Sequence, residues 1–182
     1  MKSAIGLIEL SSIAKGIEVS DAMLKRADVE IIVNRTICPG KYMILIGGDV
    51  DAVNASVETG IEISADELVD NFIIPNVHPS IFPAISGINP VVDLQALGVI
   101  ESFSVASIIE AADAAVKSAS VELITVYLAM AIGGKGYVML TGDVASVQTA
   151  VDVGAAAISK KGLLVQKVVI PSPRKEILQS WI

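Results

Sequence analysis

AIGLIELSSIAKGIEVSDAMLKRADVEI, at Ala4–Ile31, matches ALGVIESFSVASIIEAADAAVKSASVEL, at Ala96–Leu123, at 14 of 28 positions. The two stretches lie 92 residues apart, and the spacing becomes 94 residues at the next match, Gly40-Lys41 with Gly134-Lys135. The second copy therefore carries two extra residues before this dipeptide. A repeat at this spacing in a chain of 182 residues predicts a tandem duplication of a unit of about 90 residues.

Each copy has the same predicted order of strands and helices. Short apolar runs between turn residues indicate strands, and apolar residues three and four positions apart indicate helices. In the first copy we expect, in order, a strand at Ala4–Leu10, a helix after an N-cap at Ser11 or Ser12, strands at Val29–Ile37 and Tyr42–Ile46, a helix capped by Asp49, and a strand at Leu68–Ile74. The last strand of the second copy is expected at Leu163–Ile170. The order β-α-β-β-α-β predicts an α+β fold of the ferredoxin-like type, with both helices on one face of a sheet.

The predicted helices have apolar faces. The first helix carries one such face, which consists of Ile13, Ile17, Ser20, Leu24 and Ala27. Its equivalent in the second copy consists of Val105, Ile109, Ala112, Val116 and Ala119. The inner face of the helix after Asp49 is expected to consist of Val50, Val53, Val57 and Ile61.

The segment between the copies is rich in proline. From His78 to Asp93 it contains Pro79, Pro83, Gly87 and Pro90, so we expect a linker with at most one short helix. The predicted domains are residues 1–88 and 94–182.

The composition points to a protein that buries surface between chains. Hydrophobic residues make up 53% of the sequence and charged residues 18%. Units of about 90 residues have a high ratio of surface to volume. Two separate small cores do not need this much apolar sequence, so the excess predicts an oligomer.

Charge and hydropathy exclude several classes of protein. A net charge of −7 with scattered Lys and Arg gives no basic patch for nucleic acid. The longest uncharged apolar run, Leu123–Gly134, is shorter than the ~20 residues of a membrane span. The N-terminal segment reaches Glu9 too soon for a signal peptide, and a single cysteine cannot form a disulfide within the chain. We therefore expect a soluble, cytoplasmic protein that binds no nucleic acid and no membrane.

Several short motifs carry a resemblance to a known family. The strings AIGLIEL, DAMLKRA and GGDV, and then ALGVIES, DAAVKSA and TGDV, resemble the BMC domain of bacterial microcompartment shell proteins. The strings TICPGKY, VHPSIFPAISG and IGGKGYVMLTGDV resemble the tandem T type found in propanediol-utilisation microcompartments. The resemblance covers essentially the whole chain, once in each half.

The resemblance implies a structural role and no enzymatic activity. Proteins of this family form flat hexagonal tiles with a pore on the symmetry axis, and tandem forms reach the same shape as pseudohexameric homotrimers. The implied location is the microcompartment shell in the cytoplasm. The implied partners are other BMC shell proteins at the tile edges.

The resemblance also assigns roles to particular residues. The turn between the second and third strands lines the pore in this family, and the matching residues are Cys38, Pro39, Gly40, Ile132, Gly133 and Gly134. The lysine at the tile edge matches Lys25 and Lys117. An edge arginine is expected after the last strand, but the matching positions hold His78 and Ser172, and Arg174 is a candidate substitute.

Cys38 is the residue with the most specific predicted chemistry. A lone cysteine is usually a small buried hydrophobe. In a Pro-Gly turn on a three-fold axis, however, one cysteine per chain becomes three converging thiolates, which are ligands of iron–sulfur clusters. T-type shell proteins carry such a cluster at the pore, which implies one [4Fe-4S] cluster per trimer, held by Cys38 of each chain. The cluster would transfer electrons across the shell or deliver clusters to enclosed enzymes, with a lumenal redox enzyme as a further partner.

Other functions stay open at this point. A plain shell tile would have a bare Cys38 and a pore that passes small metabolites. A metabolic enzyme or a small-molecule sensor could use the same fold, although no nucleophile–base pair is evident in the sequence. Lys41 and Lys135 either tune the pore or are solubilising surface residues, and Glu9 and Glu101 are expected to cap or pair at a subunit contact. His78 is taken as an edge residue rather than as a metal ligand.

Overall fold

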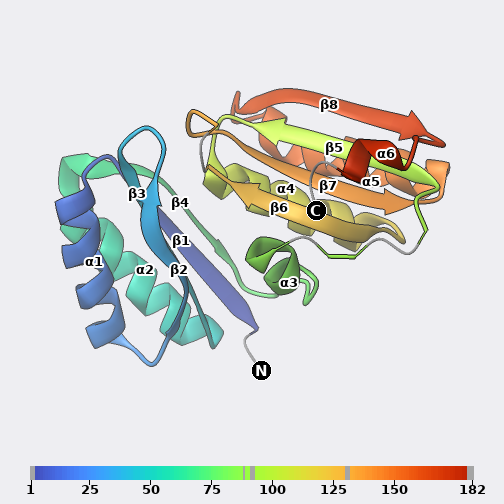
Figure 1. Cartoon of the computed structure of the whole chain (residues 1–182). Helices are drawn as coiled ribbons and strands as arrows, with labels where there is room; N and C mark the ends of the chain where they lie inside the picture. The colour runs from blue at the N-terminus through green and yellow to red at the C-terminus, as the bar shows by residue number, and fades with distance from the viewer. Residues whose placement is uncertain (1–2, 88, 91–92, 130–131, 180–182) are drawn as a thin grey trace. The chain divides into compact units, whose positions relative to one another are not determined.

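The computed structural model describes residues 3–87, 89–90, 93–129 and 132–179. Its contacts divide the chain into two compact units, Met1–Val77 and His78–Ile182. The elements of both units are labelled in Figure 1. None of the helices in these described ranges is long and apolar enough to cross a membrane.

The first unit is a four-stranded antiparallel sheet with two helices on one face (Figure 1). The strand order is β2-β3-β1-β4. The elements are β1 (Ala4–Leu10), α1 (Ile13–Arg26), β2 (Glu30–Ile37), β3 (Lys41–Gly48), α2 (Val50–Ser64), the 3-10 turn η1 (Ala65–Glu67) and β4 (Leu68–Ile74).

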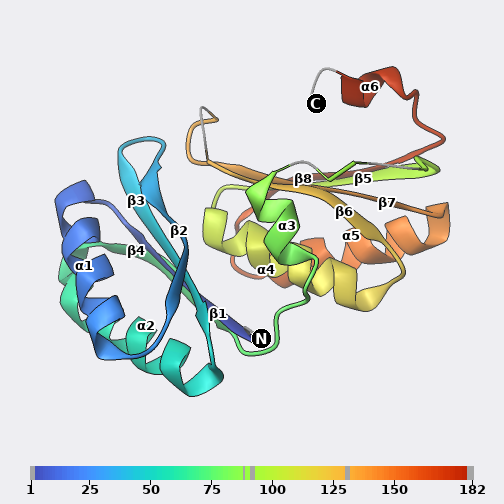
Figure 2. The ribbon, with the colours of Figure 1, turned by 60° about the horizontal axis from the view of Figure 1, so that its bottom comes forward.

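The second unit repeats this arrangement with the strand order β6-β7-β5-β8. Its elements are α3 (Ile81–Ser86), β5 (Ala96–Ser102), α4 (Val105–Ser118), β6 (Glu122–Leu128), β7 (Gly136–Gly142), α5 (Val144–Ser159), β8 (Leu164–Pro171) and α6 (Glu176–Gln179). In Figure 2, α4 and α5 lie on one face of the sheet and α6 lies on the opposite face. The predicted α+β tandem of ferredoxin-like units is confirmed.

The register of the strands preserves the repeat in detail. Gly6 pairs with Ile46 in the first sheet, and Gly98 pairs with Leu140 in the second. Each sheet also has an irregularity at the same place on its edge strand, between Ile31 and Val33 in β2 and at the equivalent point of β6. The two extra residues of the second copy lie in the connection between β6 and β7, which spans 129–135, whereas the β2–β3 connection spans 38–40.

Polar caps begin three of the four main helices. Ser12 and Ser104 occupy equivalent N-caps, and their hydroxyls accept hydrogen bonds from the backbone N–H of the residue three positions on, at 3.3 and 3.2 Å. Such a bond satisfies one of the free N–H groups of the first turn. Asp143 caps α5 in the same way, at 2.9 Å from Ser146 N. Asp49 occupies the expected N-cap of α2 but makes no side-chain cap bond.

The core of the first unit lies between its helices and sheet. It is formed by one face of β1 and β3 together with α1 and α2, and its buried members include Ile8, Met23, Ile44, Val53 and Val57. Val50 and Ile61, expected on the inner face of α2, are only partly buried and pack at the margin of this core.

The sheet-facing side of α1 differs from the apolar face given by the sequence. Gly16, Val19, Ser20 and Met23 are buried, whereas Ile17 is 58% exposed. Gly16 is at the contact because its missing side chain leaves room for the ring of Tyr42. Of the predicted face, only Ser20 is buried, so the stripe of Ile13, Ile17 and Leu24 is an exposed apolar surface.

The proline-rich linker contains one short helix, α3, which packs on β6. Ile81 and Ala84 are its buried residues. Asn89 continues the contact, since its backbone N–H donates to Ile124 O at 2.8 Å and its side chain donates to Leu123 O at 2.9 Å. Residues 78–87, expected within the first domain, therefore make their contacts in the second unit.

Candidate functional site

The turn between β2 and β3 carries the only cysteine of the chain. It consists of Cys38, Pro39 and Gly40, and the Cys38–Pro39 peptide bond is cis. The turn closes through a hydrogen bond from Gly40 N to Ile37 O at 3.1 Å. Gly40 has a φ of +85°, which a residue with a side chain rarely adopts. The thiol of Cys38 is free and partly exposed at this turn, so it is accessible for ligation.

The equivalent turn in the second unit has a different chemistry. Gly133 and Gly134 both have positive φ, at +66° and +85°, and Lys135 N donates to Ile132 O at 3.4 Å. Gly133 and Gly134 have no side chains, and Ile132 offers only carbon. Of the two turns, only the first therefore presents a metal-binding side-chain atom among its described residues.

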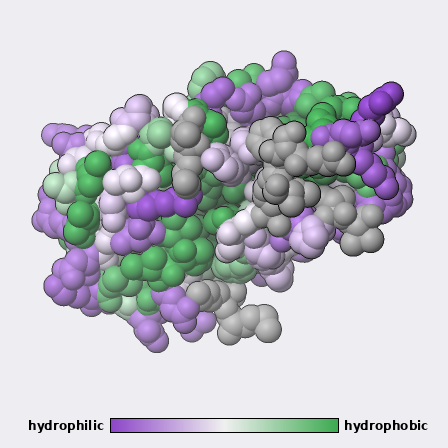
Figure 3. Space-filling model, viewed as in Figure 1, coloured by the Kyte–Doolittle hydropathy of each residue, from purple (hydrophilic) through white to green (hydrophobic). Residues whose placement is uncertain are grey.

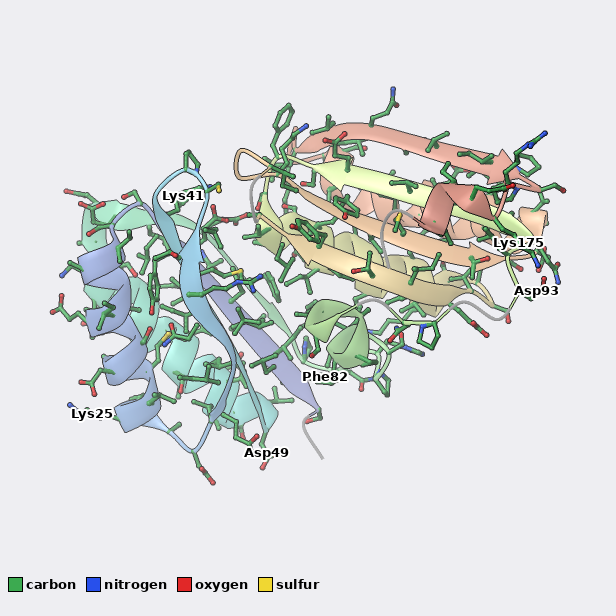
Figure 4. All side chains as sticks on the ribbon, in the orientation of Figure 1. Lys25, Lys41, Asp49, Phe82, Asp93 and Lys175 are labelled. Carbon is green, nitrogen blue, oxygen red and sulfur yellow. The ribbon has the colours of Figure 1, made fainter. Side chains whose placement is uncertain are left out.

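An ion pair lies behind each turn. Lys41 Nζ contacts Glu9 Oε1, and Lys135 Nζ lies 2.5 Å from Glu101 Oε1. Lys41 and Lys135 are thus paired with a carboxylate of their own repeat and are not isolated surface charges. Figure 4 shows Lys41 at the β2–β3 turn, at the opposite end of the first unit from Lys25 and Asp49.

The two ion pairs differ in burial. The side chain of Glu9 is 0% exposed and that of Glu101 is 31% exposed. Burial raises the pKa of Glu9, and the charge of Lys41 opposes this shift only in part. Asp70 raises the pKa of Glu9 further. The second carboxylate oxygen, Oε2, is buried without a hydrogen-bond partner.

Two of the four predicted edge residues meet at one carboxylate. Asp113 is buried, lies 2.5 Å from Lys117 Nζ, and accepts a hydrogen bond of 2.7 Å from His78 N. The ring Nδ1 of His78 lies 2.7 Å from Ser80 Oγ. Lys25 makes the matching pair with Asp21 in the first unit, at 2.5 Å and largely exposed.

Arg174 is the remaining predicted edge residue, and Cys38 is the predicted metal ligand. Arg174 is exposed, beyond the end of β8. Within the described parts of a single chain, no three His, Cys, Asp or Glu side chains are grouped so as to hold a metal ion. A metal site at Cys38 would therefore need ligands from further copies.

The open face of the second sheet carries an apolar pocket that was not predicted from the sequence. It has a volume of about 290 Å³ and is lined by Leu97, Val99, Glu101, Tyr137, Met139, Ile170, Ile177 and Leu178. Leu178, from α6, is buried in a cluster with Leu97, Ile124 and Met139. The signal was present in β5, where alternate residues Leu97 and Val99 face away from the helices and are apolar as well.

The BMC domain family matches the chain twice, at residues 4–77 and 96–173. These two matches coincide with the two sheets and their helices, and the chain belongs to this family of bacterial microcompartment shell proteins.

Full-length similarity makes this assignment more specific. The bacterial microcompartment shell protein PduT of Citrobacter freundii is 48% identical over 182 residues, covering 100% of this chain and 99% of PduT. The crystal structure of a microcompartment protein from Desulfitobacterium hafniense DCB matches with a TM-score of 0.90 at 50% identity, covering 98% of this chain and 99% of the other. The shell protein EutM of Salmonella typhimurium (strain LT2) is 43% identical over 84 residues, which span 46% of this chain and 85% of EutM.

These findings confirm the resemblance, the fold and the structural role expected from the motifs. The chain is a structural shell protein of a bacterial microcompartment and not an enzyme. Its predicted location in the shell is confirmed on the same basis.

Proposed function

We propose that three copies of the chain form a pseudohexameric tile whose central pore holds one [4Fe-4S] cluster through Cys38 of each copy. The tile would join other BMC shell proteins at its edges, with Lys25, Lys117, His78 and Arg174 as candidate contacts. Three comparisons between the repeats support the proposal. They concern a helix face, a sheet face and a turn.

The first comparison concerns the apolar face of the first helix in each repeat. Ile17 on α1 is 58% exposed, whereas its equivalent Ile109 on α4 is 0% exposed. Ile13 and Leu24 share the exposure of Ile17. An apolar helix stripe of this kind on a soluble protein indicates a surface that another protein covers.

The second comparison concerns the sheet face that the main helices leave open. In the first sheet Leu7 is buried and Phe72 is 4% exposed, whereas the equivalent Val168 in the second sheet is 44% exposed. The open face of the first sheet is thus buried, and that of the second keeps exposed apolar side chains. Figure 3 shows apolar surface along β5 and β8.

A second copy of the chain supplies the missing cover for both surfaces. The α1 stripe of one copy would pack on the second sheet of the next, so two different surfaces meet. A contact between two different surfaces repeats head to tail and closes into a ring when the rotation allows it. Three copies with two repeats each give six BMC domains around one axis.

The third comparison concerns the turns, and it supports the cluster. In a three-fold ring the three Cys38 turns are equivalent, so three thiolates come from three chains. Thiolates are the protein ligands of iron–sulfur clusters. The second turn offers glycines and an isoleucine in the same place, so the ring would carry three sulfur ligands and not six.

A bound cluster would supply one-electron chemistry, for transfer across the shell to a lumenal redox enzyme or for delivery of the cluster itself. The protein would supply the thiolates and hold the turn through the Gly40–Ile37 hydrogen bond. The similarity to PduT supports a propanediol-utilisation microcompartment as the setting.

The test is iron and sulfide content per trimer in anaerobically purified protein. We expect one cluster per trimer, with the brown colour and visible absorbance of a protein-bound iron–sulfur cluster. Cys38→Ala should lose the iron and the colour while light scattering still reports a trimer. Colourless, iron-free protein after anaerobic reconstitution would contradict the cluster. It would favour the second candidate, a plain tile whose pore of Cys38, Pro39, Gly40, Ile132, Gly133 and Gly134 passes small metabolites.

A further inference from the structure

The carboxylate of Glu9 lies behind the Cys38 turn, and only one of its two oxygens is paired. Its Oε1 contacts Lys41 Nζ, whereas Oε2 is buried without a hydrogen-bond partner among the described residues, and the side chain is 0% exposed. A charged carboxylate is costly to bury when one oxygen has no partner. Ionisable groups in such surroundings cluster at functional sites. Glu9 is therefore a residue whose burial calls for a functional explanation.

The residues that lie across the sheet from this carboxylate differ between the repeats. Directly paired residues of neighbouring strands point to the same face of a sheet. One such row crosses the first sheet and consists of Arg35, Met43, Glu9 and Asp70. The equivalent row of the second sheet consists of Tyr127, Tyr137, Glu101 and Gln166. A second carboxylate thus faces Glu9, whereas an uncharged amide faces Glu101.

These neighbours favour a bound proton on Glu9. Burial raises the pKa of Glu9, the charge of Asp70 raises it further, and Lys41 opposes the shift only in part. Arg35 lies in the same row but two strands away, with Met43 between it and Glu9. The repeat that carries the cysteine is therefore also the repeat whose strand-end carboxylate is poised to bind a proton.

Lys41 connects this carboxylate to the Cys38 turn and to solvent. Ile37 and Lys41 are paired where the hairpin closes, and Gly40 N donates to Ile37 O at 3.1 Å. Lys41 is thus held three residues from Cys38, with at most ~11 Å between their Cα atoms. Its side chain is 20% exposed, so its ammonium contacts both water and the buried Glu9. It can give a proton to Glu9 and recover one from water.

We propose that the Glu9 side chains around the cluster take up one proton when one electron enters the cluster from a one-electron donor. This inference rests on the proposed function. The proton passes from Lys41 Nζ to Glu9 Oε1, and Lys41 regains a proton from water. One electron and one proton are gained together, so the net charge of the tile is unchanged. Negative charge added at the turn favours the neutral carboxyl, and by linkage the neutral carboxyl favours the added electron.

The test is a redox titration of the cluster-loaded trimer with dithionite, followed by visible absorbance at a series of pH values. In the wild type, the equilibrium constant for reduction should fall by up to tenfold per pH unit above pH 4.5, which is about 59 mV for one electron. Glu9→Gln keeps the shape of the side chain but cannot take a proton in this range, so its potential should not change with pH. Glu101→Gln is the matched control and should titrate like the wild type.

Asp70→Asn provides a second variant, which leaves Glu9 and Lys41 in place. It should keep the pH dependence but move it to lower pH, because the charge that raises the pKa of Glu9 is removed. Iron content and circular dichroism of each variant should match those of the wild type.

The outcomes separate this inference from the cluster itself. Protein that binds no iron after anaerobic reconstitution overturns the cluster and the proton uptake together. A loaded trimer whose potential does not change with pH overturns the proton uptake and leaves the cluster intact. A pH dependence that is the same in the wild type, in Glu9→Gln and in Asp70→Asn has the same consequence.

Discussion

The two repeats have the same strands, helices and register but differ in which surfaces they leave uncovered. In the first repeat Leu7 and Phe72 on the open sheet face are buried and the helix stripe is exposed, whereas in the second repeat Ile109 on the equivalent helix is buried and Val168 on the open sheet face is exposed. The residues that build each core are retained in both repeats. They include the capping serines Ser12 and Ser104, and Gly6 and Gly98, which lie against α2 and α5. The difference teaches that divergence after duplication concentrated on outer surfaces and on one turn.

The largest effect is expected when an aspartate replaces one of the two equivalent isoleucines, Ile17 in the first repeat or Ile109 in the second. Ile17→Asp should leave folding intact and abolish the proposed trimer, because the side chain is 58% exposed on the α1 stripe that is proposed to dock on the next copy. Ile109→Asp should cost about 3 kcal/mol or more of unfolding free energy, because the carboxylate would be buried without a partner. Light scattering and circular dichroism separate the two results.

The conservative variant Ile17→Val is the control and should remain trimeric. A trimeric Ile17→Asp protein would remove the α1 stripe from the proposed interface.

A smaller effect is expected from alanine at the equivalent helix glycines. In Gly154→Ala the new Cβ would lie 2.7 Å from the backbone oxygen of Ala111, so α4 and α5 would have to move apart. Overpacking of this kind costs about 1–3 kcal/mol. In Gly60→Ala the nearest atoms belong to the side chains of Ile8 and Met23, which can adjust, and alanine favours the helix over glycine by about 1 kcal/mol. Urea titration should report a clear loss for Gly154→Ala and little change for Gly60→Ala. Equal losses of unfolding free energy in the two variants would contradict the claim that a backbone atom limits the space at Gly154 and movable side chains limit it at Gly60.

The smallest expected effect is a pH dependence of the unfolding free energy that arises from Glu9 of the first repeat. Because the pKa of Glu9 is raised in the folded chain, the folded state binds more protons than the unfolded state above the ordinary carboxyl pKa of 4.5. The unfolding free energy should therefore fall as pH rises from 4.5 through the raised pKa, by at most about 1.4 kcal/mol per pH unit. Thermal unfolding across this range should show the fall in the wild type and in Glu101→Gln. The fall should be absent in Glu9→Gln, and a profile unchanged by Glu9→Gln would contradict the role of this residue.

Much of the fold could be predicted because each strand and helix occurs in both copies of the repeat, so each copy provides a check on the other. The strands Ala4–Leu10 and Leu68–Ile74 were predicted to the residue, and β3 was found longer than Tyr42–Ile46 at both ends. The predicted apolar face of α1 is not the side of the helix that meets the sheet, since Ile13, Ile17 and Leu24 are exposed. Helical spacing indicates that Ile13, Ile17 and Leu24 share a face, but it does not say whether that face meets its own sheet or another surface.

Other features of the site depend on tertiary packing, which the spacing of residues along the sequence does not predict. The pairing of Glu9 with Lys41 joins residues from neighbouring strands, and their distance follows from the β1–β3 register. The place of α6 could not be predicted, because equivalent terminal segments pack on different strands in the two repeats. The roles assigned to Cys38 and to the edge residues stay predictions.

The geometry of the β2–β3 turn has an evolutionary consequence. Pro39 fixes its own φ, and Gly40 holds a φ of +85° with open space where a side chain would be, so backbone conformation restrains both positions. Position 38 is the one that can change its side chain without disturbing the turn. Cysteine and serine codons differ by a single nucleotide. A lineage of such shell proteins can therefore gain or lose a thiol at this turn in one mutational event, with the sheets, the helices and the proposed docking surfaces unaltered.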